Sequence, residues 1–300
     1  MMKVFSEIID ANKGMALALG FFDGVHVGHQ KVIASAVDNA RKNGTMSAVI
    51  TFKEHPQVVL RGCAPEYILT SEQRRERFEL LGVDYCYELD FADIAGLNGE
   101  QYLQNILLDK FSPISISTGF NHFFGVNRTG SPQLLRECAN SYKYEYFEMP
   151  PVVVEKEVVS SSLIRKKLLE GDVCAAGKLL GVPFFVGGVV QRGAGLGAKI
   201  GFPTANISYP KQILRIPFGV YGAKVSLSGK EYSAIVNFGI KPTFEGLVAE
   251  PVVEGHILGV DKILYGEYVE FKLLKLIRKE RKFLSVEELV SQIKVDIKSL

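Results

Sequence analysis

The sequence of 300 residues has no tryptophan, five histidines and four cysteines (Cys63, Cys86, Cys138 and Cys174). The cysteines show no C-x-x-C spacing, which excludes a disulfide scaffold and predicts reduced thiols in a cytoplasmic protein. Long apolar runs are also missing, since the stretch at 15–22 is far shorter than the about 18 residues that span a bilayer. The N-terminus has no A-x-A-like cleavage site, so we expect no signal peptide.

Neither sign of charge is in large excess, because 35 Lys and Arg oppose 33 Asp and Glu, giving a net charge of +2. Neither half of the chain is basic enough to predict a nucleic-acid partner. With 47% hydrophobic and 23% charged residues, the composition is that of a globular protein and excludes disorder. The length suffices for about two domains. Self-association stays open, because the sequence does not indicate an oligomeric state.

The first 181 residues alternate between strand-like and helix-like segments. Thr70 and Gln73 have the spacing of a capping box and mark the start of one helix. This alternation predicts a parallel sheet with helices on both faces. The predicted strands are 16–19, 47–52, 84–89, 114–118 and 144–149, and the predicted helices are 29–42, 71–81, 100–109, 132–140, 162–169 and 173–180.

The pattern changes after the G-V-P sequence at 181–183, where we expect the domain boundary. The following segments are short, β-branched and separated by Gly and Pro, which predicts an antiparallel barrel or sandwich. Ser285 and Glu288 form a second predicted capping box, which opens a terminal helix that ends at about residue 298. The predicted strands are 184–190, 219–225, 232–237, 252–258 and 268–276.

The motif G-F-F-D-G-V-H-V-G-H at 20–29 lies where the first predicted strand ends and the first helix begins. Ligands bind at this end of a parallel strand, and a helix start offers free N–H groups to phosphates. His26 and His29 can donate hydrogen bonds to phosphate oxygens, which indicates nucleotidyl transfer without a covalent enzyme intermediate. The alternative is a pair of surface histidines. The expected ATP-binding residues of this segment are Gly20, Phe22, Asp23, Gly24 and Gly28.

A second phosphate motif is S-S-S-L-I-R at 160–165, where three hydroxyls precede an arginine at a predicted helix start. Ser161 and Ser162 would hold the triphosphate, and Arg165 would neutralise the charge that develops on a pyrophosphate leaving group. An ordinary N-cap cluster is the alternative, because serine is a preferred cap.

The segment at 193–206 is rich in glycine and ends in P-T-A-N. It is neither a Walker A loop nor a G-x-G-x-x-G helix start, but glycine loops can wrap phosphates through their N–H groups. The Thr204 hydroxyl could ligate Mg²⁺, assisted by Asn206. A glycine-rich hairpin is the alternative. The expected ATP-binding residues here are Gly193, Gly195, Gly197, Lys199, Gly201 and Pro203.

Together these motifs resemble the prokaryotic bifunctional riboflavin kinase/FMN adenylyltransferase (FAD synthetase) family over essentially the whole chain. Further matches are T-F-x-x-H-P at 51–56 and G-F-N-H-F-F-G at 119–125. In the second half they are G-F-P-T-A-N at 201–206, N-F-G-I-K-P-T-F at 237–244 and E-G-H-I-L at 254–258.

The resemblance implies an α/β protein with two domains. Residues 1–181 would form a Rossmann-like nucleotidyltransferase domain, and 182–300 an antiparallel β-barrel riboflavin kinase-like domain with a terminal helix. The implied reactions phosphorylate riboflavin to FMN and adenylylate FMN to FAD, with ATP and Mg²⁺. By the same resemblance, Glu254 is the general base for the ribityl hydroxyl. The implied flavin contacts are His55, Pro56, Asn121, Phe124, Arg128 and Arg278.

Some positions depart from the family pattern. Phe21 stands where Asn is usual and Asn121 where Asp is common, while Leu196 and Ala198 stand in a loop that usually carries a basic residue. Losing a charge-assisted phosphate contact weakens ATP binding about ten- to a hundredfold. Two alternatives therefore stay open, namely a monofunctional FMN adenylyltransferase with a degenerate kinase barrel and a catalytically silent flavin-binding regulatory protein. Adenylyl transfer to another acceptor would leave the G-F-P-T-A-N barrel unexplained.

Overall fold

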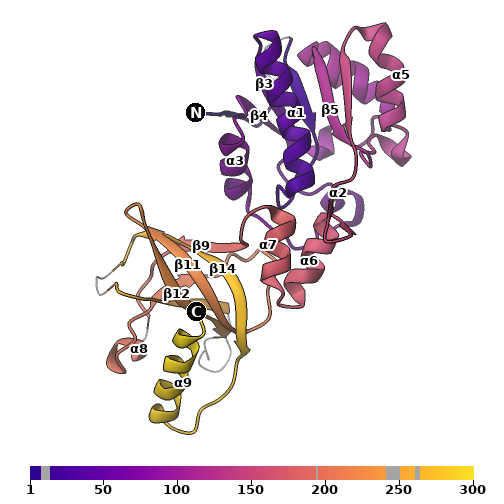
Figure 1. Ribbon diagram of the computed structural model, residues 1–300. Helices are drawn as coiled ribbons and strands as arrows, with labels where there is room; N and C mark the ends of the chain where they lie inside the picture. Colours follow the sequence, from indigo (N-terminus) through magenta and orange to yellow (C-terminus); the bar gives the residue numbers. More distant parts are fainter. Residues whose placement is uncertain (8–13, 194, 241–250, 261–263) are drawn as a thin grey trace. The chain divides into compact units, whose positions relative to one another are not determined.

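The computed structural model describes residues 1–7, 14–193, 195–240, 251–260 and 264–300, so the K-P-T-F sequence at 241–244 lies outside the described residues. The chain forms two compact units, Met1–Ser161 and Ser162–Leu300 (Figure 1). The predicted domain boundary at 181/182 stays a prediction. Among the described residues, no helix has both the length and the apolar character needed to cross a membrane.

The first unit is built on a six-stranded sheet with the order β1-β4-β3-β2-β5-β6, in which every pair is parallel. This confirms the predicted α/β architecture. The strands are β1 (Lys3–Phe5), β2 (Ala16–Leu19), β3 (Ser47–Phe52), β4 (Tyr85–Leu89), β5 (Ser115–Gly119) and β6 (Glu145–Met149). The helices are α1 (Val27–Asn43), α2 (Gln57–Arg61), α3 (Ser71–Leu80), η1 (Phe91–Asp93), α4 (Gly99–Gln101), η2 (Tyr102–Phe111), η3 (Val126–Arg128) and α5 (Pro132–Tyr142), and β7 (Val153–Val154) pairs with β8 (Glu157–Val158).

Helices cover both faces of this sheet. The strands are buried on both sides, as β2 shows with four buried residues in succession. Leu17 and Leu19 belong to a core that includes Leu107 and Phe111 of η2 and Leu135 of α5. Successive side chains of a strand alternate between faces, so Ala16 and Ala18 lie on the other face, where α1 runs along β2, β3 and β5 (Figure 1).

The strand order reverses at β2. The chain moves outward from β2 to β3 and β4 on one side, whereas β5 and β6 lie on the other. The loops that leave β2 and β5 therefore diverge, and such a switch point at the carboxyl ends of parallel strands is where open α/β sheets bind ligands. Both the 20–29 motif and the 119–125 motif begin at this point.

The second unit contains a six-stranded antiparallel sheet with the order β10-β13-β12-β11-β14-β9. Gln191, just after β9, donates its N–H to the Asn206 carbonyl of β10 at 2.8 Å, which brings the two edges together into a nearly closed barrel. The predicted barrel is thus confirmed. The elements are α6 (Ser161–Leu169), α7 (Val173–Leu180), β9 (Phe185–Val189), α8 (Leu196–Lys199), β10 (Ala205–Ser208), β11 (Gly219–Leu227), β12 (Lys230–Ile240), β13 (Pro251–Ile257), β14 (Tyr268–Lys279) and the terminal α9 (Val286–Lys298).

Two predicted helices differ from the structure in detail, and one predicted capping box is wrong. The first helix begins at Val27 rather than at residue 29, because His26 is its N-cap. The predicted helix at 100–109 is mostly π-helical, as η2. At the terminal helix, Ser285 accepts from the Glu288 N–H, but the Glu288 carboxylate accepts from the Leu284 N–H and so does not complete a capping box. The capping box of Thr70 and Gln73 is confirmed on both sides.

Candidate active sites

The first candidate site surrounds the loop between β2 and α1. Three residues of this loop have left-handed backbone angles, with φ of 59° at Phe22, 81° at Gly24 and 40° at Val25. A side chain at Gly20 would lie 2.9 Å from the Phe22 ring, so glycine is needed there. Such strain persists only where the surrounding structure holds it in place, and it is typical of ligand-binding loops.

The buried side chain of Asp23 connects this loop to the segment at 68–69. Its carboxylate is 3% exposed and accepts hydrogen bonds from the backbone N–H groups of Ile68 at 3.0 Å and Leu69 at 3.4 Å. The expected ATP-binding role of Asp23 stays a prediction. The observed contacts make it a residue that shapes the loop through segment 68–69.

His26 and His29 are brought together at the start of α1. The His26 Nδ1 caps the helix by accepting from the His29 N–H at 3.2 Å, and the two rings stack with 3.5 Å between their centroids. Burial lowers the pKa of His26 to about 4. Burial also lowers the pKa of His29 well below its usual value, and the neighbouring His26 lowers it further.

Both rings are therefore neutral at pH 7. Because Nδ1 of His26 accepts a hydrogen bond, its proton resides on Nε2, which can donate to a phosphate oxygen. The His29 Nδ1 is buried and has no hydrogen-bond partner among the described residues. Phe22 fixes the His29 ring edge-on, with centroids 5.3 Å apart. The pair can act as two preorganised donors at a helix start.

The serine motif lies at the start of α6. The Ser161 hydroxyl donates to the Asp23 carbonyl at 3.0 Å, so this serine belongs to the loop that carries the histidines. Ser162 and Arg165 lie on α6 within the second unit. Their expected contacts with the triphosphate stay predictions.

Sequence reasoning missed Arg74, a buried cation beside this loop. It lies on α3, is 2% exposed, and donates to the carbonyls of Phe21 at 2.7 Å and Phe52 at 3.3 Å. Its guanidinium also lies 4.3 Å from the centroid of the Phe21 ring. Burial lowers the pKa of Arg74, whereas the Asp23 and Glu88 carboxylates raise it. Only the tertiary structure places this residue at the ends of β2 and β3.

The T-F-x-x-H-P motif follows β3 and lies next to the same loop. The His55 ring meets the Phe21 ring edge-on, with centroids 4.7 Å apart, and its Nδ1 accepts from the Gln57 N–H at 3.1 Å. Pro56 is the residue before α2. Phe21 thus packs between His55 and Arg74 and offers no polar side-chain group there.

The expected flavin loop begins where β5 ends. Phe124 exchanges two backbone hydrogen bonds with Gly130, of 3.1 and 2.9 Å, and its ring would clash with any side chain at Gly130. Asn121 is exposed, and the Arg128 guanidinium lies 4.1 Å from the Phe123 ring centroid. The Nε2 atom of His122 is buried without a hydrogen-bond partner among the described residues, and burial lowers the His122 pKa to about 4.

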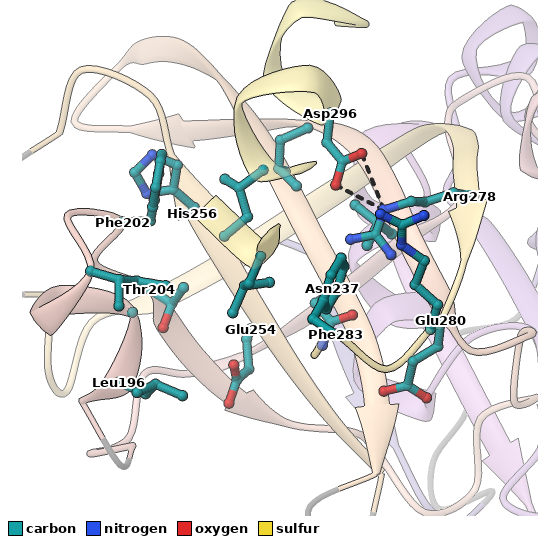
Figure 2. Close-up of a pocket in the computed structure, with 17 residues that line it drawn as sticks. Leu196, Phe202, Thr204, Asn237, Glu254, His256, Arg278, Glu280, Phe283 and Asp296 are labelled. Carbon is teal, nitrogen blue, oxygen red and sulfur yellow. Dashed lines mark hydrogen bonds and ion pairs between the residues drawn. The ribbon is translucent and has the colours of Figure 1, made fainter. Parts of the chain in front are cut away.

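The second candidate site is a pocket of about 230 Å³ in the second unit. One row of paired residues crosses five strands beside it, because Glu254 pairs with Asn206 and Asn237, and Val220 pairs with Asn237 and Arg278. Figure 2 shows Thr204, Glu254, Asn237 and Arg278 following one another across this pocket. Directly paired residues point to the same face of a sheet, so Glu254 stands in this row between Asn206 and Asn237. Asn237 lines the same pocket as Glu254, whereas Asn206 lines a neighbouring pocket.

Thr204 and Asn206 form a polar pair at the edge of this site. The Asn206 Nδ2 donates to the Thr204 hydroxyl at 3.2 Å, while the buried Asn206 Oδ1 has no hydrogen-bond partner among the described residues. A buried, unpaired carbonyl oxygen beside a hydroxyl fits a hard cation such as Mg²⁺, which prefers oxygen ligands. Gly193 lies against this amide, since a side chain there would come within 2.7 Å of it.

The glycine loop folds tightly over Thr204. Gly195 has a φ of 71° and precedes the short helix α8, and a side chain at Gly197 would come within 2.4 Å of the Phe202 carbonyl. The His256 ring bonds the Pro203 carbonyl through Nδ1 at 2.8 Å. Leu196 is exposed, and Lys199 ends α8. The ATP contacts expected of Gly201 and the other loop residues stay predictions.

Comparisons with known proteins agree with this two-part arrangement. A family model described as FAD synthetase matches residues 8–163, and one described as riboflavin kinase matches 180–300. The bifunctional riboflavin kinase/FMN adenylyltransferase of Bacillus subtilis is 34% identical over 284 residues, which cover 93% of this chain and 89% of the relative. The protein of the same name from Escherichia coli K12 is 30% identical over 288 residues, which cover 95% of this chain and 91% of the relative.

The fold is also shared with a solved structure. A crystal structure described as a macrolide-efflux protein from Streptococcus pneumoniae has a TM-score of 0.88 and 32% sequence identity to this chain. The match covers 99% of this chain and 97% of that chain. The fold is therefore shared over practically the full length.

Proposed function

This chain belongs to the family of bifunctional riboflavin kinase/FMN adenylyltransferases, and we propose how its residues divide the two reactions. The enzyme phosphorylates riboflavin to FMN and adenylylates FMN to FAD with release of pyrophosphate, using ATP in both steps. The observation that carries this function is the match of two family models to successive, separate segments. A monofunctional enzyme and a silent flavin-binding protein are not favoured.

For the kinase reaction, Glu254 is the proposed general base. It would accept the proton of the terminal ribityl hydroxyl while that oxygen attacks the γ-phosphorus of ATP and ADP leaves. Its position in the sheet supports this role. Glu254 is paired with Asn206 on one side and with Asn237 on the other, and it lines the pocket. Neighbouring amides can orient a carboxylate without neutralising it.

Mg²⁺ is the proposed metal of this site, held by the Thr204 hydroxyl and the Asn206 Oδ1 together with ATP. When bound, it neutralises the phosphate charge. The backbone N–H groups of the 193–203 loop would hold the same phosphates. The unpaired Asn206 oxygen beside Thr204 supports this assignment.

For the adenylyl transfer, a phosphate oxygen of FMN would attack the α-phosphorus of ATP and release pyrophosphate. His26 and His29 would donate hydrogen bonds to the phosphates from the start of α1. Ser161, Ser162 and Arg165 would hold the triphosphate, and Arg165 would offset the charge on the leaving pyrophosphate. The stacked, buried histidine pair on a strained loop supports this role.

The proposed FMN position follows from the switch point. The loops after β2 and β5 start from neighbouring strands, so a flavin held by the 119–130 loop would present its phosphate near the histidine loop. His55, Asn121, Phe124 and Arg128 are the proposed flavin contacts there. Cytoplasmic localisation and action without a nucleic-acid or membrane partner remain proposals.

Product analysis by chromatography tests this function. The purified protein is incubated with Mg-ATP and either riboflavin or FMN. We expect FMN and then FAD from riboflavin, and FAD and pyrophosphate from FMN. FAD from FMN with untouched riboflavin would instead show that Leu196 and Ala198 have left the barrel inactive.

A further inference from the structure

Asp296, near the end of α9, is a buried carboxylate in the wall of the second pocket. It is 1% exposed, and its two oxygens accept from the Arg278 Nε at 3.1 and 2.9 Å. The Gln292 side chain, one turn earlier on the same helix, donates to it at 2.7 Å. Figure 2 shows the ion pair at the pocket, with Asp296 above Arg278.

This pairing leaves the outer nitrogens of Arg278 available to a ligand. A guanidinium has five N–H donors in a rigid fork, and Asp296 engages Nε. Nη1 makes one long bond to the Lys279 carbonyl at 3.4 Å, and Nη2 donates no hydrogen bond to any described residue. Arg278 lines the same pocket as Glu254.

The helix that carries Asp296 also supplies apolar surface to the pocket. Leu289 and Ile293 of α9 line it together with Val220 and Ile235 of the barrel. The ion pair therefore links β14 to the last turn of a helix that closes one side of the pocket. Glu288 of the same helix instead forms an exposed ion pair with Arg281, which precedes the helix and also lines the pocket. The side chains of Glu288 and Arg281 are 43% and 49% exposed.

We infer that Asp296 is a positioning residue of the kinase reaction, which holds the Arg278 guanidinium so that its outer N–H groups face the flavin. This inference rests on the proposed kinase function of the second unit. Arginine has many rotamers, and fixing the side chain before binding removes an ordering penalty that substrate binding would otherwise include. The planar guanidinium can donate to acceptor atoms at the edge of a planar ligand such as a flavin. The apolar residues of the pocket can pack against the flavin ring.

The experiment compares D296N with E288Q, which changes an exposed carboxylate of the same helix. Riboflavin phosphorylation and FMN adenylylation are measured on each full-length variant. For D296N we expect the KM for riboflavin to rise about tenfold or more, as for the loss of one charge-assisted hydrogen bond. Adenylylation should be unchanged, because it is assigned to the first unit, and E288Q should match the wild type in both reactions.

A double-mutant cycle distinguishes positioning from a purely structural role. If Asp296 acts through Arg278, D296N should add no further change in riboflavin KM to R278M. If the effects of D296N and R278M on the KM for riboflavin are additive in the double variant, the inference is overturned. R278K keeps the charge that pairs with Asp296 but loses the fork, so we expect an unchanged melting temperature and a raised KM. A wild-type KM in R278K would also overturn the inference.

The result for the wild type separates this inference from the proposed function. If the wild-type chain does not phosphorylate riboflavin, the kinase function itself fails. If the wild type is active and D296N has the same riboflavin KM as E288Q, only the role of Asp296 fails.

Discussion

At the scale of single residues, the histidine pair of the first unit is unusual in its charge state. Two rings stacked at 3.5 Å cannot both carry a charge without strong repulsion, and burial opposes even one charge. In the proposed adenylylation site, the pair would therefore meet ATP as neutral hydrogen-bond donors. A bound triphosphate, with its negative charge, would raise both pKa values and favour protonation at the moment of binding.

The lowered pKa of His26 predicts a pH-dependent stability. His26 titrates at about 4 when folded and at about 6.5 when unfolded. The unfolded chain binds more protons at His26 between these values, so the contribution of His26 to the free energy of unfolding is fully present above pH 6.5 and is lost as the pH decreases toward 4. The full shift corresponds to about 3 kcal/mol.

Urea unfolding, followed by circular dichroism at pH 7 and pH 5, measures this effect. H26Q lacks the titrating imidazole at this position, so its free energy of unfolding should fall less than that of the wild type between pH 7 and pH 5. Equal losses in the two proteins would contradict the assignment.

Arg74 predicts a second residue-scale effect, in adenylylation. R74M removes the guanidinium that donates hydrogen bonds to two backbone carbonyls at the ends of β2 and β3. We expect this change to lower the free energy of unfolding by about 2 kcal/mol or more. Adenylylation of FMN should fall because the loop that carries His26 loses its support, while riboflavin phosphorylation should persist.

R75Q is the matched control for Arg74. Arg75 is the next residue of α3. Its side chain is 33% exposed, pairs with the exposed Glu72 at 3.3 Å and lies 3.8 Å from the Glu88 carboxylate. We expect the free energy of unfolding of R75Q to lie within about 1 kcal/mol of the wild type, as for the loss of partly exposed ion pairs. If R74M adenylylates FMN like R75Q, Arg74 does not support the loop.

At the scale of elements, periodicity predicted most of the first sheet. The strands at 16–19 and 47–52 coincide with β2 and β3, because buried parallel strands form short apolar runs. The sequence could not reveal β10, since residues 205–208 become a strand only by pairing with β13. It could not reveal the π-helical winding of η2, because packing against the sheet, rather than residue type, decides it.

The candidate sites were predictable only in part. Sequence motifs identified His26, His29, Thr204 and Glu254 as candidates, because each lies in a short motif whose neighbouring residues form the loop or strand that carries it. Arg74 and Asp296 lack a local signal. Each is one of several charged residues on its helix, and only tertiary packing buries it against a loop or strand distant in sequence.

The flavin loop predicts an element-scale effect at Gly99, the first residue of α4. A side chain there would come within 2.5 Å of the Gly130 backbone, which pairs with Phe124. G99A should therefore displace the 124–130 segment and raise the KM for FMN in adenylylation. At Gly96 a methyl group meets nothing within 4 Å, so G96A is the control. Equal KM values in the two variants would contradict a role of this loop in flavin binding.

At the scale of the whole molecule, two compact units carry two different phosphate chemistries. The first offers neutral donors on a strained loop at a switch point, and the second offers a carboxylate between two amides in a barrel pocket. FMN is the product of one reaction and the substrate of the other. Each reaction therefore shows whether its own unit is intact when the site of the other unit is changed.

A complementation assay with E254Q and H26A tests this division most directly. E254Q should make FAD from FMN but leave riboflavin unchanged, and H26A should accumulate FMN from riboflavin. A mixture of the two variants should convert riboflavin to FAD. Riboflavin phosphorylation by E254Q at the wild-type rate, or FAD formation by H26A at the wild-type rate, would contradict the assignment of the two sites.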